Sequence, residues 1–435
     1  MNYNETMDYL LGLDVFGWHP GLSRIEKLME TLGNPERSMR FVHIGGTNGK
    51  GSTTAMTASV LQRAGYRTGT FISPHLVSYR ERISIDGQWI SEEDLAETAT
   101  YVRGKVEEMV AQGHEQPTGF EVSTAITIWH FYQQKTDIAV MEVGLGGAID
   151  STNVITPVVS VITNVTMDHM EYLGNSIREI ATVKAGIIKK GVPILTGSEE
   201  SDALEVIEQR AQEMDAPLHV VGRDLYYNIL ELTEVGTRFV IKNAYGRKLE
   251  LFTPLVGAHQ AVNGTLVALV AQELNARNVP VSDEALVEGM AGTSWPARLE
   301  MIRTNPQVLL DAAHNYDGAV KLKRSLNVIY KYNRLIYVIG MLADKQRIKV
   351  MTQLGPLADV IVVTKPNSPR AGDWRAMSTE ALRYTPEVYE QEDIIRAVEI
   401  ALDLAGPDDL ICIAGSIYMV AYAREYFLKQ DRKAA

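Results

Sequence analysis

The sequence predicts an α/β protein in two parts: an N-terminal domain with a mainly parallel sheet and a small appended antiparallel sheet, then a smaller Rossmann-like α/β domain. Short apolar runs alternate with longer amphipathic segments, which is typical of parallel strands joined by crossover helices. A glycine-rich loop follows the first apolar run, and a break near residue 292 precedes a second alternation. A chain of 435 residues is also too long for one ordinary core.

The first part of the chain is expected to supply the larger sheet and its helices. Its predicted strands are short apolar runs at residues 41–46, 67–73, 137–144 and 158–165. Its predicted helices have apolar residues at helical spacing, at residues 50–64, 92–112, 121–135 and 176–190.

The pattern changes near residue 217, where alternating apolar residues and turn signals predict a few antiparallel strands. Helices are expected at about 258–274 and 283–291. Gly292 and Pro296 then break the pattern, so we place the boundary there, with domains of residues 1–294 and 295–435. The strands expected in the second domain are residues 307–313, 334–340, 358–365 and 409–415.

Composition narrows the class of protein. Lys and Arg total 42 against 54 Asp and Glu, and this net charge of −12 disfavours a nucleic-acid binder. Cys412 is the only cysteine, which excludes an intrachain disulfide and favours a reducing compartment. The first residues lack the pattern of a signal peptide, and no apolar run is long enough to span a membrane. We therefore expect a cytoplasmic protein.

The segment GGTNGKGS at residues 45–52 follows a predicted strand and opens a predicted helix. Backbone N–H groups of such a loop converge on one point, where the helix dipole also favours an anion. We expect Lys50 to reach the terminal phosphates of a nucleotide and the Ser52 hydroxyl to bind Mg²⁺. The loop departs from the usual G-x-x-x-x-G-K-[ST], because Ile44 takes the first glycine position and Gly51 separates Lys50 from Ser52. A glycine turn without a ligand is the alternative, but the strand–loop–helix setting favours a P-loop nucleotide-binding domain.

The loop is similar to the signature of the Mur ligase family, and further segments resemble its folate branch, the folylpolyglutamate synthases and dihydrofolate synthases. These segments are SPHLVSYRERISIDG (73–87), EVGLGGAIDSTNVI (142–155), TNVTMDHMEYLG (163–174), IATVKAGIIK (180–189), WPARLE (295–300), DAAHN (311–315) and AGSIY (414–418). The resemblance implies an ATP-dependent amide ligase that adds L-glutamate to the glutamate tail of reduced folates through an acyl phosphate. Monomers are expected from the same resemblance.

The resemblance also implies which residues bind ATP and metal. The phosphates would be held by Gly46, Thr47, Asn48, Gly49, Lys50, Gly51 and Ser52. ATP would be reached from the far side by Asn263, Arg298 and Asp311, which places the nucleotide between the domains. Two Mg²⁺ ions are implied, the first at Ser52 and the second at Ser73, Glu142 and His169. Lys184 matches a lysine that is carbamylated by CO₂ and acts through the second metal.

Catalytic and substrate-binding roles follow in the same way. The implied catalytic residues are Lys50, Lys184, His169 and His314, and the implied glutamate-binding residues are Arg82, His314 and Ser416. Phe120, in TGFEVST (118–124), is a candidate for stacking on the pterin ring or equally a core aromatic. Alone, Glu142 could be a solvated carboxylate and Lys184 a surface lysine. Their joint occurrence in the family's order favours the functional roles.

Departures from the family's motifs bear on the substrate. Ala148 stands where arginine is common, Val183 where an acidic residue often precedes the lysine, and Ala297 where WPGRLE has glycine. Loss of a cation at residue 148 favours glutamate addition to reduced folates over dihydrofolate synthesis from dihydropteroate, although a bifunctional enzyme is the alternative.

Two other classes compete with a folate ligase. A cell-wall precursor ligase is disfavoured because only 44 residues precede Gly45, too few for the additional domain of those enzymes. A nucleotide-binding regulatory protein would not need the second metal set of Ser73, Glu142, His169 and Lys184.

Overall fold

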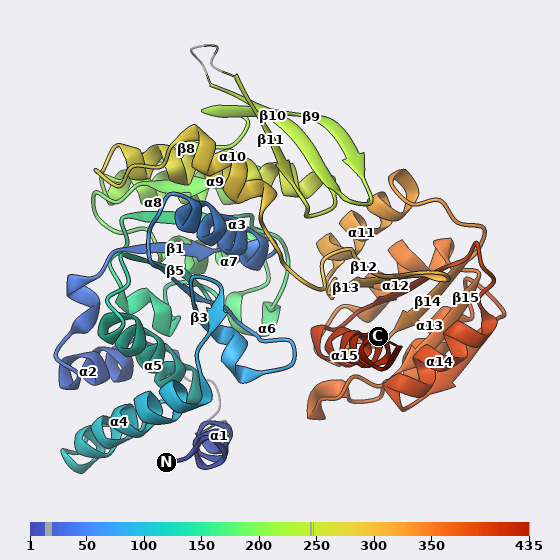
Figure 1. The fold of residues 1–435 in the computed structure, drawn as a ribbon, viewed down its shortest axis with the longest axis horizontal. Coiled ribbons are helices and arrows are strands. Elements are labelled where there is room, and N and C mark those ends of the chain that lie inside the picture. The colour runs from blue at the N-terminus through green and yellow to red at the C-terminus, as the bar shows by residue number, and fades with distance from the viewer. Residues whose placement is uncertain (14–19, 244–245, 247, 435) are drawn as a thin grey trace.

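The computed structural model describes residues 1–13, 20–243, 246 and 248–434 of the chain. It shows two bodies joined by a short crossing segment, with the three-stranded sheet at one end of the larger body (Figure 1). The mixed α/β class predicted from the sequence is confirmed. Among the helices in the described part of the chain, none has both the length and the apolar character that a membrane span requires.

An eight-stranded sheet forms the centre of the larger body. Its strands are β1 Phe41–Gly45, β2 Thr68–Phe71, β3 Ile83–Ile85, β4 Gln88–Trp89, β5 Ile138–Glu142, β6 Val159–Ile162, β7 Ile194–Thr196 and β8 Leu218–Val220. The order is β4-β3-β2-β5-β1-β6-β7-β8, and β3 runs antiparallel to both of its neighbours, β2 and β4, in an otherwise parallel sheet. The P-loop strand β1 is therefore interior.

Helices cover both faces of this sheet. They are α1 Tyr3–Gly12, α2 Ser23–Thr31, α3 Lys50–Arg63, α4 Glu92–Ala111, α5 Gly119–Gln133, α6 Met170–Leu173, α7 Ile177–Ala185, α8 Ser201–Glu213, α9 Ala258–Asn275 and α10 Asp283–Ala291. Successive side chains of β1 point to opposite faces, so Val42 and Ile44 share a core with α3, α9 and α10, whereas Phe41 packs with α2, α4 and α5.

The predicted antiparallel strands form a separate three-stranded sheet. They are β9 Leu225–Thr233, β10 Gly236–Asn243 and β11 Lys248–Thr253, in the order β11-β10-β9. Phe239 of β10 docks this sheet on α9, where a side chain at Gly264 would lie 2.5 Å from the Phe239 ring. Glycine at residue 264 therefore permits the close approach of sheet and helix.

A six-stranded sheet forms the smaller body, in the order β12-β13-β17-β14-β15-β16. Its strands are β12 Glu300–Thr304, β13 Gln307–Asp311, β14 Leu335–Ile339, β15 Val360–Thr364, β16 Val388–Gln391 and β17 Leu410–Ala414. Only β12 is antiparallel. The helices are α11 Tyr316–Val328, α12 Arg347–Leu354, α13 Ala376–Ala381, α14 Ile394–Leu404 and α15 Ile417–Ala434. The first three pack on one face and the last two on the other.

The segment that joins the two bodies packs first against one core and then, within a few residues, against the other. Trp295 packs on the core of the larger body, whereas Ala297 is buried in the core of the smaller one. The packing changes from one body to the other between Trp295 and Ala297, close to the division placed after residue 294, which stays a prediction.

The structure differs from the sequence prediction at one helix end, in several elements that were not predicted, and in the pairing of one strand. The helix expected over residues 176–190 ends at Ala185, and Ile187 and Ile188 then pack in the core outside any helix, which explains their misleading spacing. The short strands β3, β4, β7, β12 and β16 and the helices α1, α2 and α8 were not predicted. The strand β8 begins the stretch that was expected to be antiparallel, but it pairs in parallel with β7 in the large sheet.

Candidate active site

The predicted site residues follow the carboxyl ends of parallel strands in both sheets. Gly46 follows β1, Glu142 ends β5, and His169 follows β6. Asp311 ends β13, and Ser416 follows β17. Ligands of open α/β sheets bind outside these strand ends, so the topology brings both sets of residues to one place.

A cleft of about 670 Å³ lies where the two bodies meet. It is lined by nearly all of the predicted residues: Thr47, Asn48, Gly49, Lys50, Gly51, Ser52, Ser73, Arg82, Phe120, Glu142, His169, Asn263, Arg298, Asp311, His314 and Ser416. Gly46 and Lys184 are the predicted residues that lie behind its wall, and they contact each other. The sequence therefore identified residues that meet in space from both domains.

The P-loop requires glycine at particular positions. Gly46 has φ +135°, and a Cβ there would lie 1.9 Å from the Thr163 hydroxyl. Gly49 precedes α3 with φ +85°, and a Cβ there would lie 2.7 Å from Asn263 Oδ1. L-residues rarely adopt such φ values, so neither glycine can be replaced without strain.

The loop after β6 holds the P-loop from one side. The backbone N–H groups of Thr47 and Asn48 donate to the carbonyl and side-chain oxygens of Asn164, at 2.9 and 2.8 Å. The Thr163 hydroxyl donates to the Asn48 carbonyl at 2.7 Å. Lys50 and Ser52 begin α3, and Lys50 Nζ donates to the Thr47 carbonyl at 3.2 Å. An open helix N-terminus beside an ammonium is an arrangement that favours anions.

The predicted second-metal residues offer oxygen and imidazole donors to the cleft. Burial raises the pKa of the Glu142 carboxyl to about 7, while Lys50 and the Ser73 N–H, which donates to it at 3.3 Å, act in the opposite direction. Burial lowers the pKa of His169 to about 4, so its imidazole is neutral and able to bind a metal. Within the described residues, no three His, Cys, Asp or Glu side chains converge as a metal cluster. One buried carboxylate with a hydroxyl and an imidazole fits Mg²⁺ when phosphate oxygens complete the ligand set.

Lys184 is buried on α7 behind the P-loop. Its Nζ donates to the Gly46 carbonyl at 2.8 Å. Burial, reinforced by the nearby Lys50, lowers its pKa to about 7. Lys184 therefore loses its proton more readily than a surface lysine does.

The smaller body presents Arg298 and Asp311 to the cleft. Asp311 accepts hydrogen bonds from the Leu299 and Ala313 N–H groups at 2.9 and 2.8 Å. Burial raises the pKa of Asp311, and the positive charge of Arg298 opposes this. Ala297 is in the left-handed region with φ +58°, at the position where the related motif has glycine. That backbone conformation explains why glycine suits the position.

The predicted substrate residues fall on both sides of the cleft. Ser416 Oγ is buried and has no hydrogen-bond partner among the described residues, while His314 contacts the Ala312 carbonyl at 2.9 Å through Nδ1. Arg82 donates through Nε to His75 at 2.9 Å. Phe120 lies beside Gly144, where a Cβ would come within 2.5 Å of its ring.

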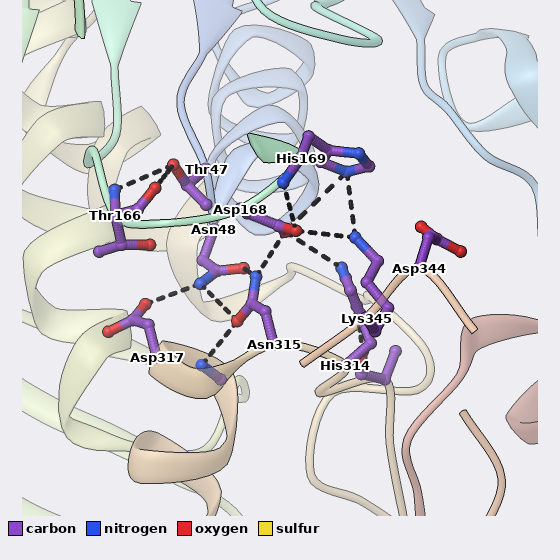
Figure 2. Close-up of polar contacts among 12 residues, drawn as sticks. Thr47, Asn48, Thr166, Asp168, His169, His314, Asn315, Asp317, Asp344 and Lys345 are labelled. Carbon is purple, nitrogen blue, oxygen red and sulfur yellow. Dashed lines mark hydrogen bonds and ion pairs between the residues drawn. The ribbon is translucent and has the colours of Figure 1, made fainter. Parts of the chain in front are cut away.

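The sequence analysis missed a polar cluster between the bodies (Figure 2). Asn48 Nδ2 donates to Asn315 at 3.1 Å and to Asp317 at 2.7 Å. Asp168 accepts from Asn315 and from Lys345, both at 2.8 Å. Asn315 falls within a quoted motif, but no pattern in the sequence indicates that these residues meet.

Comparisons with known proteins agree with this geometry. Residues 44–271 match the Mur ligase middle domain, and residues 297–417 match the Mur ligase glutamate ligase domain. A dihydrofolate synthase/folylpolyglutamate synthase of Bacillus subtilis is 36% identical over 431 residues, which cover 97% of this chain and 98% of the relative. A folylpolyglutamate synthase of Lacticaseibacillus casei is 35% identical over 432 residues, which cover 98% and 99%.

A solved structure of Mycobacterium tuberculosis folylpolyglutamate synthase complexed with ADP superposes with a TM-score of 0.89 at 32% identity, covering 98% of this chain and 99% of that one. Family matches, relatives and structural likeness each extend over both bodies. The chain therefore belongs to the Mur ligase family, a family of ATP-dependent amide-forming ligases, and within it to the folylpolyglutamate synthases and dihydrofolate synthases.

Proposed function

We propose that the protein uses ATP to add L-glutamate to the glutamate tail of reduced folates. The observation that carries this proposal is the single cleft in which the P-loop faces Arg298, Asp311, His314 and Ser416 of the other body. Such a cleft can hold a nucleotide, an acceptor carboxylate and an amine together, and positioning of this kind supplies much of the rate in a ligase.

The proposed reaction has two steps, phosphoryl transfer and then amide formation. An oxygen of the folate carboxylate attacks the γ-phosphorus of ATP, the bond to the β-phosphate oxygen breaks, and ADP leaves. The amine nitrogen of glutamate then attacks the acyl carbon, phosphate leaves, and the nitrogen loses a proton as the amide forms. Lys50 and the N–H groups of the P-loop stabilise the charge that develops on the transferred phosphoryl group.

Four side chains would hold the two Mg²⁺ ions: Ser52 the first, and Ser73, Glu142 and His169 the second. When bound, Mg²⁺ neutralises phosphate charge during the transfer. Asn263, Arg298 and Asp311 would contact the nucleotide from the side opposite the P-loop. His314 and Ser416 would receive the incoming glutamate. The buried Ser416 hydroxyl supports this role, because it has no hydrogen-bond partner in the described part of the chain.

We also propose that Lys184 is carbamylated. Carbamylation requires a neutral amine, and burial lowers the pKa of Lys184 to about 7. The resulting carbamate would place behind the P-loop an anion that favours Mg²⁺. The rival interpretation is a plain lysine that donates to the Gly46 carbonyl and pairs with phosphate.

Tetrahydrofolate rather than dihydropteroate is the proposed acceptor. Ala148 supplies no cation, and its N–H donates to the Val183 carbonyl at 2.8 Å, beside α7. Ala148 does not line the cleft, so only a longer side chain at this position, such as arginine, would reach into the cleft. The Bacillus subtilis relative is named for both activities, which keeps a bifunctional enzyme as the second candidate. We further propose a cytoplasmic monomer as the working form.

An assay of ADP release tests the proposal. The purified protein is incubated with ATP, Mg²⁺ and L-glutamate, and with either tetrahydrofolate or dihydropteroate. We expect ADP release that requires both L-glutamate and tetrahydrofolate. Equal turnover with dihydropteroate would support the bifunctional alternative, and ADP release that ignores L-glutamate would contradict ligation.

A further inference from the structure

Asp168 of the larger body contacts side chains from two loops of the smaller body. Lys345 Nζ lies 2.8 Å from Asp168 Oδ1, and Asn315 donates to Oδ2 at 2.8 Å. His314 Nε2 lies 3.7 Å from the same Oδ2. The side chains of Asp168 and Lys345 are only 8% and 7% exposed, so this ion pair is well shielded from water. Figure 2 shows these groups converging on one carboxylate.

Lys345 makes a second contact that an interdomain ion pair does not need. Its Nζ lies 3.2 Å from His169 Nε2. An ammonium can only donate a hydrogen bond, so the imidazole nitrogen must accept through its lone pair. The backbone of His169 has φ +50°, and its backbone N–H donates to Asp168 Oδ1 at 2.8 Å. These two features hold the residue in place.

A metal ion bound through His169 Nε2 would need the same lone pair. It would also bring a divalent cation beside the Lys345 ammonium, in surroundings that already contain Lys50 and His314. Among the described residues, Asp168 is the carboxylate that lies against both Lys345 and His169. The two arrangements of His169 therefore exclude each other both sterically and electrostatically.

We propose that Lys345 is a positioning residue that opposes cation binding at His169 until its own ammonium moves away. Before the cation arrives, Lys345 holds the imidazole and joins the two bodies through Asp168. When the cation binds, the Lys345 ammonium no longer contacts His169 Nε2 but still pairs with Asp168. Loading of the second metal is thereby coupled to a contact between the domains. The inference rests on the metal-binding role proposed for His169.

Binding of Mn²⁺ to the nucleotide-free protein tests this coupling, with free Mn²⁺ followed by electron paramagnetic resonance. We expect Lys345→Met to bind Mn²⁺ about tenfold more tightly than the wild type, because it removes the competing charge. Lys345→Arg retains the charge and should bind like the wild type. Lys349→Met is the matched control, since Lys349 is an exposed lysine of α12, on the same segment.

Each outcome decides a different part of the argument. Equal Mn²⁺ affinity in Lys345→Met and the wild type would overturn the coupling, and so would the same increase in Lys349→Met. The double variant His169→Ala with Lys345→Met should lose the tighter site. Mn²⁺ binding that survives His169→Ala unchanged would overturn the metal role of His169 as well. If His169→Ala loses Mn²⁺ binding but Lys345→Met binds Mn²⁺ like the wild type, the coupling is overturned and the metal role of His169 is kept. Lys345→Gln supplies the same comparison if melting shows that the methionine variant is misfolded.

Discussion

Replacement of Glu142 by glutamine should make the ligand-free protein more stable at alkaline pH while weakening its metal site. Burial raises the pKa of this carboxyl from 4.5 to about 7. Between these values the folded protein binds more protons at Glu142 than the unfolded chain does, so stability falls as pH rises through the window. The full penalty is present above the folded-state pKa and absent below the unfolded-state pKa.

The size of this effect follows from the pKa values. One pKa unit corresponds to about 1.4 kcal/mol, so the ionised Glu142 costs the folded protein roughly 3 kcal/mol at about pH 8. Glutamine keeps an oxygen that can accept the hydrogen bond from the Ser73 N–H. Its buried amide N–H groups lack partners, however, and this cost offsets part of the stabilisation. We expect a net stabilisation of about 2 kcal/mol, or about 2–3 °C in melting temperature for a unit of about 300–400 residues.

Thermal unfolding of the wild type and Glu142→Gln at about pH 8 and about pH 5 measures this effect. The advantage of the variant should be present at the higher pH and shrink greatly at the lower one. Glu97→Gln, at an exposed position of α4, should show neither change. Addition of Mg²⁺ and ADP should stabilise the variant less than the wild type. A variant that melts below the wild type at the higher pH would refute the reasoning.

Further substitutions test individual assignments. Lys50→Ala should lower ligation by about 10²–10³-fold through loss of one charge-stabilising group, and activity within about threefold of wild type would remove the P-loop assignment. Arg298→Ala should raise the KM for ATP, although it lies far from the P-loop in sequence; unchanged ATP kinetics would exclude it from the site. Ala148→Arg should increase turnover of dihydropteroate, whereas efficient use of dihydropteroate by the unmodified protein would show that the cation is not required. Lys184→Ala should be nearly inactive and be rescued by short carboxylic acids if a carbamate is the working group; rescue by small amines would instead favour the ammonium.

Much of the fold could be predicted because its signals are local. The strands β1, β2, β5 and β6 are apolar runs bounded by turns, and the P-loop marks the junction of β1 and α3. The antiparallel sheet was also foreseen from alternating residues. Strands such as β3 and β7 were not, because three residues add to a sheet only through pairing with neighbouring strands.

The gathering of site residues in one cleft could be anticipated from topology, since strand ends of two parallel sheets face a shared crevice. The contacts between the bodies could not. Asp168 and Lys345 are 177 positions apart, and although Asp168 lies in the quoted segment 163–174, Lys345 lies in none of the quoted motifs. Their pairing depends on how the two sheets dock, which is a property of tertiary packing and not of local sequence.

Transfer of an oxygen atom tests the central claim most directly. Tetrahydrofolate labelled with heavy oxygen in its glutamate-tail carboxylates is incubated with the protein, ATP, Mg²⁺ and L-glutamate, and the released phosphate is analysed by mass spectrometry. Attack of the carboxylate on the γ-phosphate predicts that each phosphate released during amide formation carries one labelled oxygen from the folate. Phosphate without the label, released in step with glutamate addition, would contradict an acyl phosphate and the chemistry assigned to this cleft.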